Sequence, residues 1–241
     1  MDKILKRKHQ AADKFKERLL RSSVGDKIAR IILFGSLLKR DAGEESDVDL
    51  LIVATDDLKR VEEITAEISF DILLEMGEGV EPLVYCLDRV RYPDSYFVFR
   101  NTKVGKEIYK MNEREMKIEE ARGYLALAVH YLEVGEGLFN DNEYRVSSDV
   151  AYNSAELAAK GLLLFKMDEL PTSHRGIVNK FGELYVKSGE VNRELGRRLN
   201  DGIRARNKAR YESHAEIGEK EAGEMIKLAR ELIEQLSRKL I

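Results

Sequence analysis

Cysteine is nearly absent from this sequence: Cys86 is the only one among 241 residues. No disulfide can form within the chain, and a zinc site with four cysteine ligands is excluded. Chains that use so little cysteine are typical of the reducing cytoplasm. We therefore expect a cytoplasmic protein that gains no stability from covalent cross-links.

Long hydrophobic runs are also missing. No apolar run approaches the roughly 20 residues that a helix needs to cross a bilayer, so we expect no membrane segment. The opening stretch, MDKILKRKHQAADKFKERLL, lacks the continuous apolar core of a signal peptide. A strong excess of one charge is absent too. The 41 basic and 44 acidic residues give a net charge of -3, which does not favour nucleic acid as the main partner.

The first part of the chain predicts a mixture of helices and strands. Apolar residues recur at helical spacing over residues 3–21 and again over 56–76, where an acid at 56 or 57 is suited to cap the helix. Three short apolar runs, IARIILF, DVDLLIVA and VEPLVYCL, predict buried strands. Pro82 lies in the third run and favours an edge position, because proline lacks the N–H group that a central strand needs.

The second part predicts helices alone. From about residue 113 no strand-like run remains, and five helical stretches are expected at 113–138, 143–166, 174–188, 191–212 and 217–239. Short breaks between them are typical of an antiparallel bundle. The expected fold class is therefore α+β, with a small mixed-sheet domain over 1–111 followed by an all-α domain over 112–241.

Two acids, Asp47 and Asp49, open the second predicted strand. Residues two apart on a strand point to the same face, so these carboxylates project together. Paired carboxylates repel each other, and a shared divalent cation such as Mg²⁺ relieves the repulsion. Gly35 and Ser36 follow the preceding strand, where a glycine lets the backbone approach a phosphate and a serine donates a hydrogen bond. The alternative is that the two acids simply flank a turn.

The segment FGS, followed after ten residues by DVDL, resembles the signature of the polymerase-β-type nucleotidyltransferases in their minimal form. The resemblance implies a two-Mg²⁺ site at Asp47 and Asp49, triphosphate binding at Gly35 and Ser36, and transfer of a nucleotidyl group from a nucleoside triphosphate (NTP). The family often has a third carboxylate on the following strand. Glu81 is the best-placed candidate for that role; the alternative is that it is a surface acid.

The helical part resembles a HEPN domain, a bundle often found beside minimal nucleotidyltransferases. The resemblance rests on VAYNSAELAAKGLLLFKMDELPTSHRGIVNKFGELYV and on RARNKARYES with the helix after it. Many HEPN domains are metal-independent ribonucleases that need an Arg, four to six residues and then a His. After Arg206 and Asn207 this chain has Tyr211 at the first permitted position, and His214 lies beyond the last. The pattern resembles the branch without nuclease activity, which implies nucleotide or polyanion binding at Arg206, Asn207 and Tyr211.

Together these features predict a Mg²⁺-dependent enzyme that moves a nucleoside monophosphate (NMP) from an NTP such as ATP to an acceptor hydroxyl. The acceptor is a protein, an RNA or a small molecule, and the resemblance to HEPN domains implies a homodimer. The alternative is a catalytically weak nucleotide-binding protein that regulates a partner, of the toxin–antitoxin type.

Overall fold

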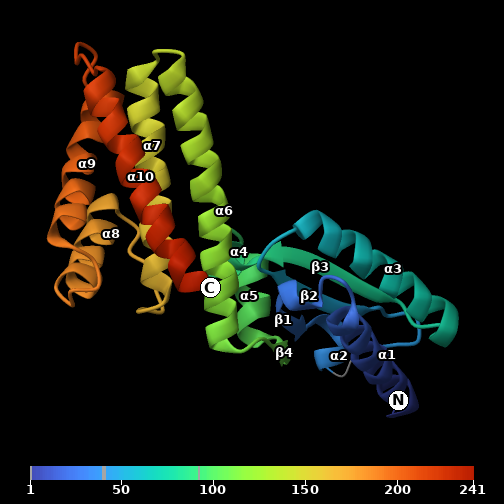
Figure 1. Ribbon diagram of the computed structural model, residues 1–241. Helices are drawn as coiled ribbons and strands as arrows, with labels where there is room; N and C mark the ends of the chain where they lie inside the picture. Colours follow the sequence, from blue (N-terminus) through green and yellow to red (C-terminus); the bar gives the residue numbers. More distant parts are fainter. Residues whose placement is uncertain (1, 40–41, 92) are drawn as a thin grey trace. The chain divides into compact units, whose positions relative to one another are not determined.

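The computed structural model describes residues 2–39, 42–91 and 93–241, and the chain divides into two compact units, 1–119 and 120–241. The first unit is built on a mixed four-stranded sheet in the order β3-β2-β1-β4 (Figure 1). Its strands are β1 (Ile28–Leu33), β2 (Val48–Ala54), β3 (Val80–Cys86) and β4 (Lys106–Lys110). β1 runs antiparallel to β2 and to β4, whereas β2 and β3 are parallel.

One face of this sheet is covered by two amphipathic helices, α1 (Asp2–Arg21) and α3 (Leu58–Met76). The alternating side chains of β2 explain the arrangement: Leu50 and Ile52 pack in the core with α1 and α3, whereas Leu51 packs in a second cluster on the opposite face. The remaining helices of the unit are short: η1 (Gly25–Lys27), α2 (Gly35–Lys39), α4 (Leu87–Arg91) and α5 (Tyr96–Val104).

The three predicted strands and two predicted helices of this part are confirmed, but the short helices α2, α4 and α5 were not predicted, and two further points need correction. β4 was not predicted, because KEIYK has only two apolar residues and neither is fully buried. Asp57 is the N-cap residue of α3, but its side chain accepts no capping hydrogen bond. Instead its own N–H donates to Asp56 Oδ1 at 2.7 Å. The edge position predicted from Pro82 is confirmed, because β3 is an outer strand.

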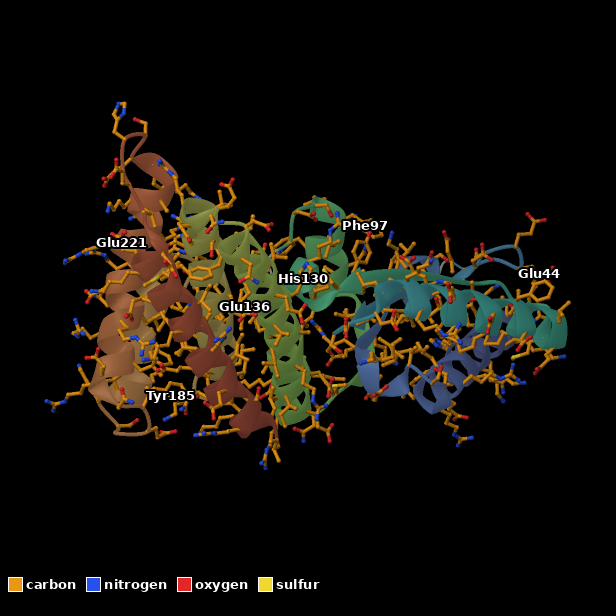
Figure 2. All side chains as sticks on the ribbon, turned by 45° about the horizontal axis from the view of Figure 1, so that its top comes forward. Glu44, Phe97, His130, Glu136, Tyr185 and Glu221 are labelled. Atoms are coloured by element: carbon orange, nitrogen blue, oxygen red, sulfur yellow. The ribbon has the colours of Figure 1, made fainter. Side chains whose placement is uncertain are left out.

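The second unit is helical, as predicted. It contains α7 (Tyr144–Leu164), α8 (His174–Phe181), the π-helical turn η2 (Gly182–Val186), α9 (Arg193–Tyr211) and α10 (Glu219–Leu240). α6 (Glu113–Asn140) begins in the first unit and continues into this one. α7 carries the largest buried set, rich in alanine, and packs against α9 and α10. Tyr185, labelled in Figure 2, is buried in this core and donates a hydrogen bond to the Leu162 carbonyl.

None of the helices in the described ranges is both long enough and apolar enough to span a membrane.

Candidate active site

Asp49 lies against the backbone of Gly35. The Phe34 N–H donates to the Asp49 carbonyl at 3.1 Å, which joins the end of β1 to the start of β2. Gly35 then adopts the left-handed conformation, with φ of +74°. A Cβ atom built on Gly35 would lie 1.8 Å from Asp49 Oδ2. Only glycine therefore fits this turn for two separate reasons, its backbone conformation and the carboxylate beside it.

Asp47 has the same relation to a second glycine. A Cβ atom on Gly79 would lie 1.8 Å from Asp47 Oδ1, and the Val48 N–H donates to the Gly79 carbonyl at 2.9 Å. Gly79 immediately precedes β3, so the hydrogen bond starts the parallel pairing of β2 and β3. Both acids of the motif thus lie against a glycine on a neighbouring segment, which leaves room for the carboxylates and no room for a side chain.

Glu81 is the register partner of Asp49 across the parallel pair β2–β3. Both residues, together with Asp47, belong to the face of the sheet opposite α1 and α3. Burial raises the pKa of Asp49, and the charges of Glu81 and Asp47 raise it further, although the Ser36 N–H opposes the shift by donating to the carboxylate. The charge on Asp49 is therefore disfavoured until a cation or a donor approaches.

The carboxylate pair suits Mg²⁺, which is commonly held by one or two carboxylates together with phosphate oxygens of a substrate. Within the described ranges, no three Asp, Glu, His or Cys side chains converge closely enough to form a complete cation site. The donor set is therefore a pair, Asp47 and Asp49, with Glu81 on the adjoining strand.

A groove of about 770 Å³ runs along the outer strand β3 beside α3 and reaches the acids. Its lining includes Asp47, Gly79 and Glu81 at one end and Arg89 at the other. A smaller pocket of about 270 Å³ is lined by Gly35 and by residues of α2 and α5. Asp49 contacts Gly35, so the acids adjoin both spaces.

Lys8 and Glu78 support this site and were missed from the sequence. Lys8 Nζ is buried and contacts Glu78 Oε2 at 2.8 Å; it also donates to the carbonyls of Glu44 and Ser46. Ser46 immediately precedes Asp47, and Glu78 immediately precedes Gly79. The Lys8 ammonium group therefore holds both segments that position Asp47. The sequence indicates this arrangement only in part. The segment GEGV, which contains Gly79, predicts the end of the preceding helix. The helical spacing of α1 does not predict that Lys8 is buried.

The three HEPN candidates lie together on α9, but Arg206 is not a free cation. It is 5% exposed, and its Nε lies 3.7 Å from Asp149 Oδ1 on α7. Its guanidinium group donates to the Asn207 amide oxygen at 3.2 Å and lies over the Tyr211 ring, 5.7 Å from the centroid. Asn207 and Tyr211 are exposed. Any anion would therefore meet Asn207 and Tyr211 first, with Arg206 behind them.

Comparison with known proteins assigns both units. The family model of the nucleotidyltransferase domain matches residues 12–122, and that of the HEPN domain matches residues 121–240. The first unit is thus a nucleotidyltransferase domain. The chain therefore combines a nucleotidyltransferase domain with a HEPN domain that follows it, as its two motifs predict.

Two relatives come from Methanocaldococcus jannaschii. "Putative toxin MJ0142" is 32% identical over 91 residues, which are 38% of this chain and 61% of that protein. "Putative toxin MJ0605" is 29% identical over 122 residues, which are 51% of this chain and 90% of that protein. The match therefore spans less than two thirds of the first relative.

Solved structures show weaker likenesses. TT1696 from Thermus thermophilus matches 49% of this chain and 97% of its own, with 24% identity and a TM-score of 0.42. A spectinomycin adenyltransferase from Enterococcus faecialis, solved with ATP and spectinomycin, matches 93% and 98% with 14% identity and a TM-score of 0.33. Both scores are below 0.5, so these likenesses carry no inference about function.

Proposed function

We propose that this chain is a Mg²⁺-dependent enzyme that transfers an NMP group from an NTP to an acceptor hydroxyl. The observation that carries the proposal is the placement of Asp47 and Asp49, each against a glycine and both on the face of the sheet opposite α1 and α3. Such a carboxylate pair, beside a turn that a phosphate can approach closely, is suited to nucleotidyl transfer.

In this proposal the Asp47 and Asp49 carboxylates hold the metal, and Gly35 and Ser36 bind the triphosphate. Mg²⁺ bound there would supply positive charge to the phosphate oxygens. The acceptor oxygen forms a bond to the α-phosphorus while the bond from that phosphorus to the bridging oxygen breaks, and pyrophosphate leaves. Glu81, beside Asp49 in register, takes the proton of the acceptor hydroxyl. The acceptor, a protein, an RNA or a small molecule, approaches along the groove beside β3, which Asp47 and Glu81 line.

We further propose that the HEPN unit binds a nucleotide or polyanion through Asn207, Tyr211 and the buried Arg206, and does not cleave RNA. Tyr211 occupies the position where a HEPN ribonuclease needs a His, and a phenol hydroxyl is a poor general acid or base at neutral pH compared with an imidazole. We also propose that the protein is cytoplasmic and that it forms a homodimer through the HEPN unit. Light scattering of the purified protein tests the dimer.

A pyrophosphate-release assay tests the enzyme proposal. The parent chain, each NTP, Mg²⁺ and a cell extract as acceptor source should release pyrophosphate, and Asp47→Asn should reduce the rate at least about a hundredfold. The matched control is Asp71→Asn, an exposed acid on α3 whose nearest ion-pair partner is 3.9 Å away. Equal rates for the parent and Asp47→Asn would contradict the proposal.

The second candidate is a regulatory nucleotide-binding protein of the toxin–antitoxin type, which the names of the two relatives favour. It predicts NTP binding without pyrophosphate release in the parent chain as well as in Asp47→Asn. Calorimetric titration of both proteins with each NTP separates the two candidates.

A further inference from the structure

The smaller pocket, of about 270 Å³, is lined by Gly35 and by residues of α2 and α5. Its volume is just below the range of about 300–1,000 Å³ typical of sites for drug-sized ligands. It is therefore suited to part of a substrate, such as one ring system. Its walls combine aromatic rings with two cations: Phe34, Gly35, Lys39, Tyr96, Phe97 and Arg100.

Two aromatic residues of this pocket, Tyr96 and Phe97, are exposed although they lie on the helix α5. Tyr96 is 74% exposed and Phe97 is 42% exposed. The Ser95 side chain caps α5 by accepting from the Val98 N–H, which fixes the first turn that carries both rings. Phe97, which is labelled in Figure 2, also packs edge-to-face on Phe34, with ring centroids 5.6 Å apart. Tyr96 therefore presents a ring to solvent at the mouth of a pocket, an arrangement suited to stacking on a flat ligand.

The charged residues of the pocket indicate that such a flat ligand also carries negative charge. Lys39 and Arg100 line it, and neither forms an ion pair with another residue in the part of the chain that the structure describes. Asn101, also in the lining, carries an amide that can both donate and accept hydrogen bonds. Aromatic surface, unneutralised cations and an amide are together complementary to a base that is linked to phosphates.

The position of the pocket connects it with the acids. Gly35 is part of its lining, and Gly35 also lies against the Asp49 carboxylate. A triphosphate on the Gly35 turn can therefore have its nucleoside end in this pocket while its phosphates approach Asp49.

We infer that the α2–α5 pocket binds the nucleobase of the NTP. The base stacks on Tyr96, Asn101 bonds its polar edge, and Lys39 and Arg100 face the phosphates. This inference rests on the proposed function, because it assigns the substrate of the same site.

Calorimetric titration with each NTP and with inorganic tripolyphosphate, both with Mg²⁺, tests the inference. Tyr96→Ala should weaken NTP binding about five- to hundredfold, the range expected for one lost stacking contact, and leave tripolyphosphate binding unchanged. Tyr96→Trp should keep the NTP affinity, because it keeps an aromatic ring. The matched control is Phe99→Ala, which removes a 49% exposed ring on the same helix that is not part of the lining.

NTP binding that is equal in Tyr96→Ala and the parent would overturn the inference, and so would an equal loss of NTP and tripolyphosphate affinity. A failure of the pocket assignment can be distinguished from a failure of the proposed enzyme activity. Pyrophosphate release with a normal NTP affinity in Tyr96→Ala would contradict only the pocket assignment. A loss of NTP affinity in Tyr96→Ala, in a chain that releases no pyrophosphate, would support the pocket and contradict the enzyme.

Discussion

At the scale of single residues, the contacts of Asp47 and Asp49 with Gly79 and Gly35 are the features that most restrict the site. Gly79 offers the sharper test, because its φ is not in the left-handed region and alanine there causes no backbone strain. Its Cβ would displace the exposed Asp47 carboxylate. We expect Gly79→Ala to reduce NMP transfer at least tenfold and to change the free energy of unfolding by less than about 1 kcal/mol.

The measurements are pyrophosphate release and urea unfolding. Gly43→Ala is the control, because the nearest atom to its Cβ would be 3.9 Å away. Full activity in Gly79→Ala would mean that the position of Asp47 does not matter for the reaction.

The pair Lys8–Glu78 predicts a pH dependence of stability. Burial alone would raise the pKa of Glu78, but the hydrogen bonds and charges of Lys8 and Arg7 outweigh it and lower that pKa. A carboxylate whose pKa is lower in the folded state stabilises the fold above the unfolded pKa of about 4.3, and its contribution is lost as the pH falls through the folded pKa.

Glu78→Gln should therefore lower the free energy of unfolding at pH 7 by about 3 kcal/mol, the cost of breaking a buried ion pair. The difference from the parent should shrink between pH 5 and more acidic values. Urea unfolding at a series of pH values measures both effects, with Glu63→Gln, which removes a surface pair with Arg60, as the control. A difference that is independent of pH would contradict the assignment.

At the scale of helices and strands, most elements follow from local patterns. The helix predicted at 191–212 is α9 (Arg193–Tyr211), because its apolar residues recur at helical spacing and Asn192 caps it by accepting from the Leu195 N–H. β4 was missed because its pairing with β1 depends on residues about 75 positions away, which no local pattern records. The resemblance anticipated the sheet and its acids, whereas the contacts of Asp47 and Asp49 with glycines became visible only in the folded chain.

Arg206 illustrates the same limit on α9. The sequence presents a strip of basic residues, and periodicity does not distinguish a solvated cation from a buried one. In the structure Arg206 is buried beside Asp149, whereas Arg204 is exposed. We expect Arg206→Ala to lower the free energy of unfolding by about 1–3 kcal/mol, because it removes a buried side chain and one of the two cations beside Asp149, and Arg204→Ala to change it little. Urea unfolding that shows equal effects would contradict the role of Arg206 in the core.

At the scale of the whole molecule, the chain joins a nucleotidyltransferase domain to a HEPN domain whose nuclease motif is incomplete. We expect labelled RNA to stay intact when it is incubated with the parent chain, with or without EDTA. The physical reason is that Tyr211 stands where a His would transfer protons near neutral pH. RNA cleavage by the parent that disappears in His214→Ala would contradict this prediction and restore the nuclease assignment.

The central claim is nucleotidyl transfer by the intact chain, and incubation with each α-³²P-labelled NTP, Mg²⁺ and total cell extract tests it most directly. We predict label retained on a protein, an RNA or a small molecule with the parent chain, and none with the double variant Asp47→Asn/Asp49→Asn. The location of the label would identify the class of acceptor. Label retained equally with the double variant, or no label with a parent chain that binds NTP, would contradict the claim.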